Sequence, residues 1–501
     1  MKLMKEQVKN NQPMNFFINR AMGIGNSGVE HAQFYRARRF DEVGLPYRYI
    51  FVQLINNLHE AMDTWNLKND QVINMYEYFV LGDDYLHQGV QKFYPVKNET
   101  VVDGTNTTRL LKVQTASGMK IIETMVKFPN KEHNLLIMSL SKVEIYSSKT
   151  GEKKVTFDFY DNGHKETLIK NIHLYNQNGH QLYFPNEVQL QRYFFEQVDK
   201  AYGHSNNWFL DRGEESEAAL LYPKMPQSKV VEVVHADHLS DRNDPRYPLW
   251  NNYYEYSLTH LDNIDKIISA TKMQTNDLIE DFPNKKDKFA TIPVGGVADK
   301  GSSKTRPRAR NKKLRSLKLI TASRLAGEKH IDMLVMAVAK VHKQGKTVSL
   351  DIYGAGGEKD LIEKTIKKEK AESYIKLKGL SKHLEDVYPK YDAFISASFS
   401  EGFGLTTVEA LSAGLPVIAF KARFGALEMI QDGVNGFLQD FKRGDDNVDF
   451  DVKSLANGIN RLLKSNYSQV QKATISSMAS FQNHVIANKW KEFVDALRAN
   501  Q

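Results

Sequence analysis

The fold is decided by the stretch Ser398-Phe399-Ser400-Glu401-Gly402-Phe403-Gly404-Leu405-Thr406-Thr407-Val408-Glu409-Ala410. The apolar residues 393–397 before it predict a buried strand, and the spacing of the apolar residues after the glycines predicts a helix. Glycines at a strand-to-helix junction leave backbone N–H groups exposed at the helix N-terminus, which attracts anions. The stretch therefore predicts a parallel α/β sheet with an anion site at a strand's carboxyl end.

Two carboxylates flank this predicted anion site. Glu401 lies in the loop, where sugar hydroxyls could donate to it. Glu409 lies about one turn into the helix, where it could accept hydrogen bonds from a ribose diol. The alternative interpretation is an ordinary strand-loop-helix of a parallel sheet.

A pair of cations follows another predicted strand. Residues 317–330 predict a strand that ends in Ser-Arg, with a lysine five residues later at the start of the next helix. Arg324 and Lys329 are thereby held on one short loop. A guanidinium binds phosphate as a fork and an ammonium binds it as a point charge, so this loop predicts a two-cation clamp for a diphosphate.

Together these motifs resemble the donor site of the retaining GT-B glycosyltransferases of family four. The likeness consists of Glu-x7-Glu around Gly-Phe-Gly, of Ala-Gly-Leu-Pro-Val-Ile at 413–418, and of Ser-Arg-Leu-x4-Lys. The resemblance implies a UDP-sugar-dependent retaining hexosyltransferase of α/β class and GT-B fold, with two Rossmann-like domains facing a cleft. The donor-binding residues that it implies are Arg324, Lys329, Gly354, Gly379, Glu401, Gly402, Phe403, Gly404, Leu405 and Glu409.

A glycine-rich turn follows the first predicted strand, residues 15–19. Gly23 and Gly25 belong to a G-x-G-x-x-G pattern, and Ser27 with Glu30 predicts a capping box at the start of a helix. The pattern also fits a dinucleotide site, but no acidic residue ends the next strand, where a ribose needs one. A bare turn is a further interpretation. In the GT-B family this loop faces the cleft, so the resemblance adds Gly23 and Gly25 to the donor contacts.

A histidine ends the buried strand predicted at 229–234. Ligands bind at the carboxyl ends of parallel strands, so His235 is expected to face the crevice and contact substrate. A structural histidine and a zinc ligand are the alternatives, and the sequence offers no third zinc ligand nearby. The candidate catalytic residues are His235, Arg324, Lys329 and Glu401.

The expectation for metals follows from the same charges. The clamp and the helix N-terminus after Glu401 supply the positive potential that other transferases obtain from Mg²⁺. Asp449 and Asp451 form a D-x-D, but Asp451 is expected to cap a helix that starts at Val452. We therefore expect no metal and no cofactor, with the UDP-sugar as donor substrate.

The region after residue 100 changes to short alternating strands separated by turn signals. The predicted strands are 109–114, 119–128, 135–140, 142–146, 155–160 and 167–174. They predict an antiparallel β-meander inserted into the N-terminal domain. Because the insert carries no cluster of catalytic residue types, we expect it to serve assembly and acceptor binding.

Bulk composition limits the class of protein. A chain of 501 residues is too long to fold around one ordinary hydrophobic core, which predicts two or three domains. The chain is 41% hydrophobic and 26% charged, with no apolar run long enough to span a bilayer and no apolar segment of a secretory signal near its start. It has no cysteine, which excludes disulfides and fits a reducing cytoplasm.

The net charge is +8, and part of the excess lies in the basic run 300–318. The run lacks the interleaved aromatic residues of a single-strand nucleic-acid groove, so no nucleic-acid partner is expected. It is expected to be a solvated linker, or a contact with an anionic membrane or polymer.

We expect four segments along the chain. An N-terminal Rossmann-like acceptor domain comprises 1–53 and 201–299, and the meander module comprises 54–200. A C-terminal Rossmann-like nucleotide-sugar domain comprises 300–480, and a helix at 481–501 returns to the N-terminal domain.

Within the family there is a particular likeness to the catalytic subunits that O-glycosylate serine-rich repeat adhesins (GtfA type). It is carried by residues 23–30, 233–238 and 250–254 and by the meander. It implies transfer of GlcNAc or glucose from a UDP-sugar to serine or threonine hydroxyls. It also implies a homologous noncatalytic partner subunit or a homo-oligomer.

Two alternatives stay open for the function. Teichoic-acid α-glycosyltransferases share the donor motifs and the insert, so a poly-glycerol or ribitol phosphate acceptor is one of them. A noncatalytic, peptide-binding partner subunit is the other, although such a subunit can dispense with the donor-site charges that are present here. The expected location is the cytoplasm, with or without peripheral contact with the inner face of the cell membrane.

Overall fold

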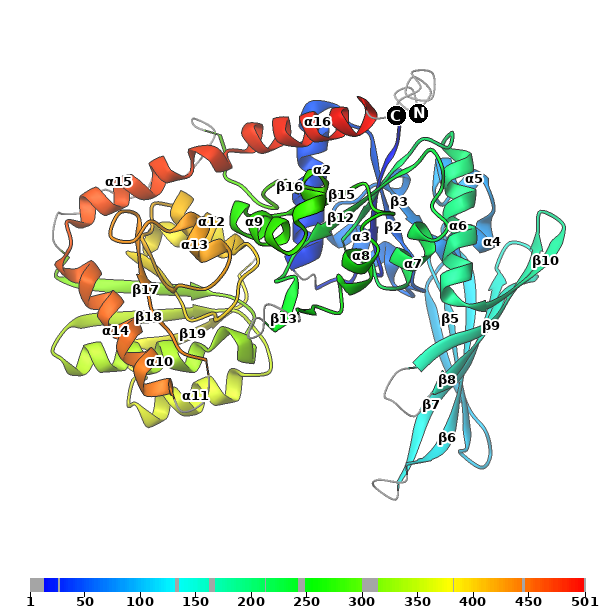
Figure 1. Ribbon diagram of the computed structural model, residues 1–501. Helices are drawn as coiled ribbons and strands as arrows, with labels where there is room; N and C mark the ends of the chain where they lie inside the picture. The colour runs from blue at the N-terminus through cyan, green and yellow to red at the C-terminus, as the bar shows by residue number, and fades with distance from the viewer. Residues whose placement is uncertain are drawn as a thin grey trace.

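The computed structural model describes residues 13–25, 28–130, 135–161, 167–211, 213–241, 248–299, 314–381, 383–443 and 447–499. Two parallel sheets form two lobes, and an antiparallel sheet projects from the first lobe (Figure 1). The predicted α/β class with an antiparallel insert is confirmed. The predicted capping residue Ser27 and most of the basic run 300–318 lie outside the described residues.

The first lobe is built on a sheet of parallel strands in the order β16-β15-β12-β11-β1-β2-β3. Its strands are β1 (Asn15–Asn19), β2 (Tyr47–Phe51), β3 (Val72–Asn74), β11 (Asn207–Leu210), β12 (Lys229–Val234), β15 (Lys266–Ser269) and β16 (Phe289–Thr291). Side chains alternate between the two faces of a strand. Phe17 packs on Phe40 of α2 (Gly28–Val43) with 5.1 Å between ring centroids, whereas Phe16 lies 4.6 Å from Trp208. Both faces of this sheet are thus buried, as is typical of parallel sheets.

Helices and short turns surround this sheet. They are α3 (Leu58–Thr64), η1 (Asn69–Gln71), α4 (Met75–Leu81), α5 (Asp84–Gln88), α6 (Glu187–Ala201), α7 (Glu215–Leu221), α8 (Glu255–Thr259), α9 (Lys272–Asp281) and η2 (Pro283–Lys288), with a small hairpin of β13 (Leu239–Asp241) and β14 (Leu249–Trp250). The last helix, α16 (Asn483–Ala499), crosses from the second lobe to lie beside α2 (Figure 1). There the ring of Trp490 lies 5.6 Å from that of Phe40, and the Tyr35 hydroxyl donates to Asn483 Oδ1 at 2.9 Å. The C-terminal helix therefore joins the two lobes.

The second lobe is built on a parallel sheet in the order β19-β18-β17-β20-β21-β22. Its strands are β17 (Ser316–Ala322), β18 (Thr347–Tyr353), β19 (Ile375–Gly379), β20 (Ala393–Ser396), β21 (Val417–Phe420) and β22 (Gly436–Gln439). Its helices are η3 (Gly327–Lys329), α10 (Ile331–Lys343), α11 (Lys359–Lys368), η4 (Leu384–Asp386), η5 (Tyr388–Lys390), α12 (Leu405–Ser412), α13 (Gly425–Met429), α14 (Val448–Lys464), α15 (Tyr467–Ser477) and η7 (Ala479–Phe481). The helices α10 and α14 share one core with the face that carries Leu319, and α12 shares another core with the face that carries Ile320.

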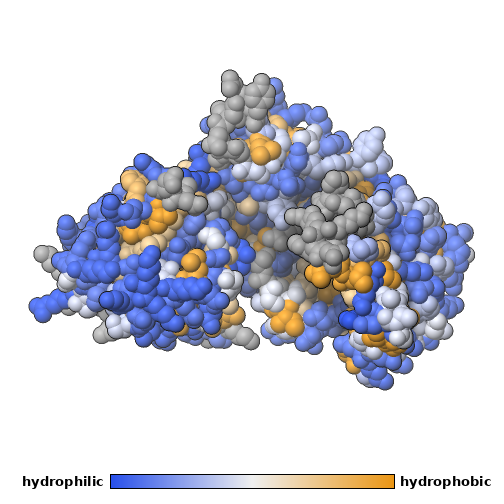
Figure 2. All heavy atoms as spheres, turned by 90° about the horizontal axis from the view of Figure 1, so that it is seen from below, coloured by the Kyte–Doolittle hydropathy of each residue, from blue (hydrophilic) through white to orange (hydrophobic). Residues whose placement is uncertain are grey.

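The antiparallel sheet has the order β10-β9-β8-β7-β6-β5-β4. Its strands are β4 (Lys97–Val102), β5 (Thr108–Gln114), β6 (Met119–Asn130), β7 (Leu135–Ser147), β8 (Lys153–Asp161), β9 (Thr167–Gln177) and β10 (His180–Asn186). Its near end packs on α4, where the rings of Tyr76 and Phe157 lie 5.6 Å apart. Its far end exposes Phe128, Leu135, Leu136 and Ile137. In Figure 2 apolar residues also gather on the side of the molecule that carries this sheet.

Three details of the predicted meander are wrong. The strands β4 and β10 were not predicted, because β4 is exposed throughout and β10 largely so, and neither shows a buried alternation. The segments 135–140 and 142–146 form the single strand β7, whose register against β6 shifts so that Ser141 has no partner. The insert also does not begin at residue 54: β3 belongs to the first parallel sheet, and the antiparallel strands start at Lys97.

No helix among the described residues is long and apolar enough to cross a membrane. Of the basic run, the described part includes Lys318, whose ammonium lies 4.5 Å from the centroid of the Tyr391 ring. This lysine belongs to the folded second lobe.

Candidate active site

Strand order places a crevice in each lobe. In the first sheet the chain winds outward in opposite directions from the neighbours β1 and β11, and in the second sheet from β17 and β20. Ligands of open α/β sheets bind at such switch points, beyond the carboxyl ends of the strands. We call the carboxyl ends of β1, β11 and β12 the first edge, and those of β17, β18 and β20 the second edge.

The second edge brings two predicted residues together. Lys329, on η3 after β17, donates from Nζ to Glu401 Oε2 at 2.7 Å, and the two side chains are 17% and 31% exposed. Arg324 lies on the same loop but points to Glu328, to which its Nη2 donates at 2.9 Å. Its side chain is 71% exposed. The loop therefore presents one enclosed cation and one solvent-facing cation.

The backbone around Glu401 shows that this carboxylate does not cap the helix that follows. The N-cap of α12 is Gly404, in the left-handed region at φ 85°, and no side chain bonds to this helix end. Glu401 is instead fixed by its backbone: its N–H donates to Arg423 O at 3.0 Å, and its carbonyl accepts from Phe424 N at 2.7 Å. Its side chain is therefore available to accept from the Lys329 ammonium.

Glu409 lies within α12 and contacts a residue that the sequence did not indicate. The Tyr388 hydroxyl donates to Glu409 Oε2 at 3.1 Å. Desolvation of the carboxylate raises the pKa of Glu409 to about 7, and the Tyr388 hydrogen bond opposes this rise. The residue as a whole is exposed, whereas its carboxylate is largely removed from water.

The two glycines expected beside the nucleotide meet at the second edge. The N–H of Gly354, after β18, donates to the carbonyl of Gly379, at the end of β19, at 2.9 Å. Gly354 has φ 143°, and a Cβ there would lie 1.9 Å from Ser323 O. A side chain at Gly354 would thus push the β18 turn away from the loop that carries Arg324.

The first edge holds a buried network around a residue that was not predicted. Asp211, directly after β11, is fully buried, and its Oδ1 lies 2.8 Å from His235 Nε2. Arg36 Nη1 and Gln33 Nε2, both from α2, donate to its two oxygens at 3.1 and 2.6 Å. Although burial opposes the charged form, Arg36 and His235 hold the pKa of Asp211 below its ordinary value. His235 is thus held on a buried carboxylate at the carboxyl end of β12.

The neighbouring histidine has a structural position. His238 is fully buried, and its Nε2 lies 3.0 Å from Asp281 Oδ2 at the end of α9.

Gly23 and Gly25 lie on the loop after β1, and the carbonyl of Gly23 accepts from Trp65 Nε1 at 3.0 Å. This bond ties the glycine loop to the residue that follows α3.

The two edges meet at Gly402. A Cβ on Gly402 would lie 2.2 Å from the carbonyl oxygen of His235, so the loop of the second lobe passes directly over the end of β12. Beside this contact Phe403 is buried, and Leu405 lies against Gly295 of the first lobe. Figure 2 shows a notch between the lobes on the face drawn there. The loop after Glu401 and the carboxyl end of β12 are therefore in contact.

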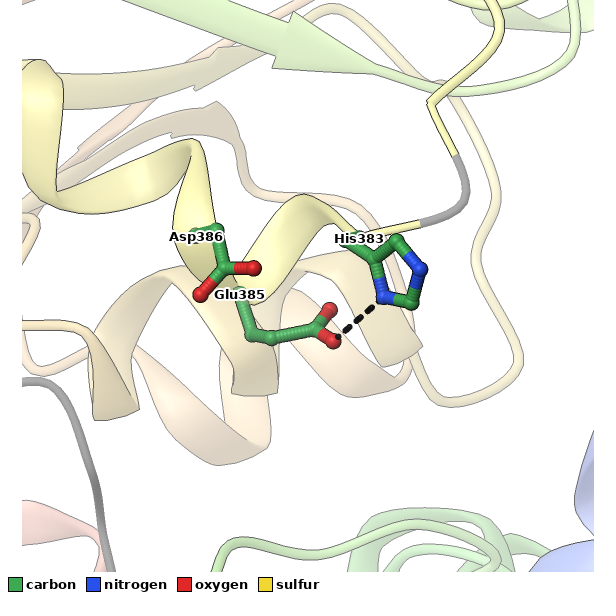
Figure 3. A group of neighbouring side chains, drawn as sticks. All are labelled: His383, Glu385 and Asp386. Carbon is green, nitrogen blue, oxygen red and sulfur yellow. Dashed lines mark hydrogen bonds and ion pairs between the residues drawn. The ribbon is translucent and has the colours of Figure 1, made fainter.

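Among the described residues, one group of side chains could hold a metal ion: His383, Glu385 and Asp386, whose ligand atoms lie within 4.8 Å of one another (Figure 3). All three are exposed on and beside η4, and exposed groups of this kind are common without an ion.

The prediction that Asp451 caps a helix is wrong. Because α14 begins at Val448, Asp451 lies inside its first turn and does not cap it; its Oδ1 accepts from Lys442 N at 2.9 Å.

The similarity of this chain to known proteins agrees with this geometry. Residues 302–476 match the family described as "Glycosyl transferases group 1". The GtfA subunit of the UDP-N-acetylglucosamine–peptide N-acetylglucosaminyltransferase of Streptococcus pneumoniae is 32% identical over 518 residues, which cover 95% of this chain and 98% of that protein. The chain belongs to this glycosyltransferase family.

Two further proteins extend the comparison. The crystal structure of the pneumococcal O-GlcNAc transferase GtfA in complex with UDP and GlcNAc superposes on this glycosyltransferase with a TM-score of 0.74 and 28% identity, covering 97% of this chain and 99% of that one. The poly(ribitol-phosphate) alpha-N-acetylglucosaminyltransferase of Staphylococcus aureus is 22% identical over 505 residues, 95% of this chain and 98% of that protein. The expected GT-B fold is confirmed.

Sequence reasoning missed the buried partners of the predicted residues in this glycosyltransferase. Asp211 follows the short apolar run of β11, and an acidic residue at the carboxyl end of a buried strand is the signal that could have found it. Arg36 and Tyr388 had no such signal, because Arg36 is one of several charged residues in α2 and Tyr388 lies in the short turn η5.

Proposed function

We propose that this glycosyltransferase moves GlcNAc from UDP-GlcNAc to serine or threonine hydroxyls of a bacterial serine-rich protein. The observation that carries the proposal is the Lys329–Glu401 pair at the second edge, next to Gly402, whose backbone lies against the His235 carbonyl of the first edge. The relative that is 32% identical is described as a UDP-N-acetylglucosamine–peptide transferase, which supports this donor and this class of acceptor.

The proposed roles follow from charge and position. Arg324, Lys329 and the N–H groups of 402–405 would stabilise the leaving diphosphate, since fixed donors are worth most where charge develops. Glu401 would accept from hydroxyls of the donor sugar, and Glu409 from the ribose. Gly354 and Gly379 would border the nucleotide, and His235, Gly23 and Gly25 would face the sugar from the first edge. We propose that 300–480 holds the donor and that the first lobe, 1–53 and 201–299 together with β3, faces the acceptor.

Within this proposal the clamp takes the place of a metal ion. The cations at the second edge already supply two positive charges, one of them paired with Glu401. We therefore propose that the enzyme needs no divalent cation. Excess EDTA should leave the transfer rate unchanged, whereas a loss that Mg²⁺ or Mn²⁺ restores would contradict this part of the proposal.

A second subunit or a second copy of the chain is proposed as partner. The relative is described as a subunit, and the far end of the antiparallel sheet exposes Leu135 and Leu136, which are 62% and 64% accessible. Exposed apolar side chains on a sheet suit pairing with another protein. Leu136→Lys should reduce the assembled size on a sizing column and leave UDP-GlcNAc hydrolysis unchanged. We propose that the enzyme works in the cytoplasm and that its basic run, 300–318, contacts the surface of the cell membrane.

The deciding experiment offers UDP-GlcNAc and UDP-glucose, each with a serine-rich peptide and with poly(ribitol phosphate), and reads the products by mass. A peptide gaining the mass of GlcNAc supports the proposal. Transfer to the polymer alone would establish the teichoic-acid alternative, which the relative at 22% identity supports. Binding of peptide without release of UDP would establish a noncatalytic subunit.

A further inference from the structure

Asp211 is a buried carboxylate that has none of the proposed roles. Its side chain is 0% exposed and lies at the carboxyl end of β11, beside the first switch point. Its Oδ1 contacts His235 Nε2 at 2.8 Å and Arg36 Nη1 at 3.1 Å. Its Oδ2 accepts from Arg36 Nη2 at 2.5 Å and from Gln33 Nε2 at 2.6 Å. Because it is completely enclosed, this carboxylate cannot touch a substrate itself.

Arg36 keeps Asp211 in the carboxylate form. A guanidinium does not lose its proton in proteins, so the buried pair is stable only as an ion pair. Arg36 is also held in place by aromatic rings, with its guanidinium carbon 4.1 Å from the centroid of Phe17. The position and the charge of Asp211 are therefore set by α2 and β1, independently of any ligand.

The carboxylate decides which nitrogen of His235 carries hydrogen. A carboxylate only accepts hydrogen bonds, so Nε2 must be the protonated nitrogen of the neutral ring. Nδ1 makes no hydrogen bond with any residue that the structure describes. The His235 backbone is fixed as well, since its N–H donates to the Tyr254 hydroxyl at 2.9 Å. The ring thus has one anchored nitrogen and one that can accept from a hydroxyl.

We propose that Asp211 is a positioning residue for transfer: it orients His235 and fixes the Nε2–H tautomer, so that Nδ1 accepts from a hydroxyl of the bound sugar or acceptor. The proposal rests on the proposed function, because it assigns His235 to the substrate. Asp211→Asn is the informative change. The amide oxygen would accept from Arg36 Nη2 and Gln33, which leaves the NH₂ group facing His235 and Arg36 Nη1. An NH₂ group donates to the His235 ring and so inverts the tautomer, as in other Asp–His pairs.

The kinetic test compares Asp211→Asn, His235→Ala and the double variant, using UDP-GlcNAc and a serine-rich peptide. We expect Asp211→Asn to lower kcat about 10- to 100-fold, with the donor KM changed less than about threefold. In the His235→Ala background the same change should cost less than about twofold, because Asp211 acts only through the ring. An equal loss in both backgrounds, or wild-type kcat in Asp211→Asn, would overturn the proposal.

A matched control shows whether the effect comes from the position of Asp211 beside His235 or from the loss of any buried carboxylate. Asp199→Asn changes another buried carboxylate of the first lobe, whose Oδ1 accepts from Asn206 Nδ2 and from Ser228 Oγ, both at 2.8 Å. Its kcat should stay within about twofold of wild type. If Asp211→Asn fails to fold, Gln33→Met keeps the ion pair and removes one donor to Oδ2. Its smaller loss of kcat should also vanish in the His235→Ala background, and persistence there would overturn the proposal.

A spectroscopic readout is independent of transfer. In protein labelled with ¹⁵N-histidine, the His235 signal, assigned by its loss in His235→Ala, should show the Nε2–H tautomer in wild type and the Nδ1–H tautomer in Asp211→Asn. The Nδ1–H tautomer in wild type would overturn the proposal. Absence of transfer by a wild-type protein that shows the Nε2–H tautomer would count against the proposed function instead.

Discussion

The two edges that meet at Gly402 differ in how far their charged side chains are enclosed by the protein. At the first edge the charges are buried and already paired, as in the ion pair of Asp211 and Arg36, which are 0% and 3% exposed. At the second edge the charges are more open to solvent: Arg324 is 71% exposed, and Lys329 and Glu401 are 17% and 31% exposed. A buried pair is rigid, and removing one partner costs about 3–5 kcal/mol, whereas an exposed pair is worth about 0–1 kcal/mol.

This difference separates two tasks. A rigid, enclosed network suits the orientation of a side chain, because it cannot rearrange without loss of stability. Exposed cations with weakly held acidic partners suit the binding of a charged ligand, because exchanging Glu328 for a phosphate costs Arg324 little. Substitutions at the second edge should therefore change catalysis and leave stability intact, and those at the first edge should change both.

The largest expected effect tests the second edge. Lys329→Ala and Arg324→Ala should each lower kcat about 10²–10³-fold, because a fixed charge that stabilises the leaving diphosphate is lost. The melting temperature should stay unchanged. Steady-state kinetics and thermal melts check this, with Lys343→Ala as control, since Lys343 is 62% exposed and pairs with Glu369 on the same lobe. Activity within threefold of wild type in both variants would remove the clamp from the mechanism.

The next effect sharpens the assignment of Glu401. Glu401→Gln keeps the size of the side chain but removes the charge that faces Lys329, and we expect transfer to fall about 10- to 100-fold through misplacement of the sugar. UDP affinity, measured by calorimetry, should be retained, as should the melting temperature. Glu363→Gln, an exposed carboxylate on α11 that pairs with Lys359, is the matched control. A normal transfer rate would show that Glu401 has only a structural role in its loop.

A smaller effect tests the contact between the edges. Gly402→Ala would place a Cβ 2.2 Å from the His235 carbonyl oxygen, so the loop must move away from the first edge. We expect kcat to fall about tenfold. Gly357→Ala is the control, because a Cβ there meets nothing within 4 Å. Equal kinetics in the two variants would mean that the edges need not touch during turnover.

The smallest effect, on stability alone, concerns the first lobe. Burial raises the pKa of Glu217 from 4.5 to about 8, and that of its buried neighbour Glu232 also rises. The folded state therefore holds a proton that the unfolded state releases, so the free energy of unfolding should fall as pH rises from about 4.5 to about 8. Glu217→Gln should flatten this fall in denaturant titrations across that range. Glu215→Gln, on the same helix, should preserve it.

Much of this arrangement follows from local sequence. The boundaries of β1 and β12 agree with the predictions because a buried parallel strand is a continuous apolar run between turns. The loops that carry Arg324, Lys329 and Glu401 were likewise readable, because each motif lies within a few residues of one strand end. Local patterns failed where burial is incomplete, as in the exposed strand β4, and where one residue interrupts an alternation, as at Ser141.

Only the tertiary structure decided how these parts combine. Asp211 and Arg36 are 175 residues apart in sequence, and Lys329 and Glu401 are 72 apart. Nothing local predicts that they meet, because strand order, not spacing along the chain, brings carboxyl ends to one edge. The sequence by itself determined which residues carry charge at strand ends. Packing of α2 on the first sheet, and of the Gly402 loop over His235, determined which of those charges are enclosed and which remain open to a ligand.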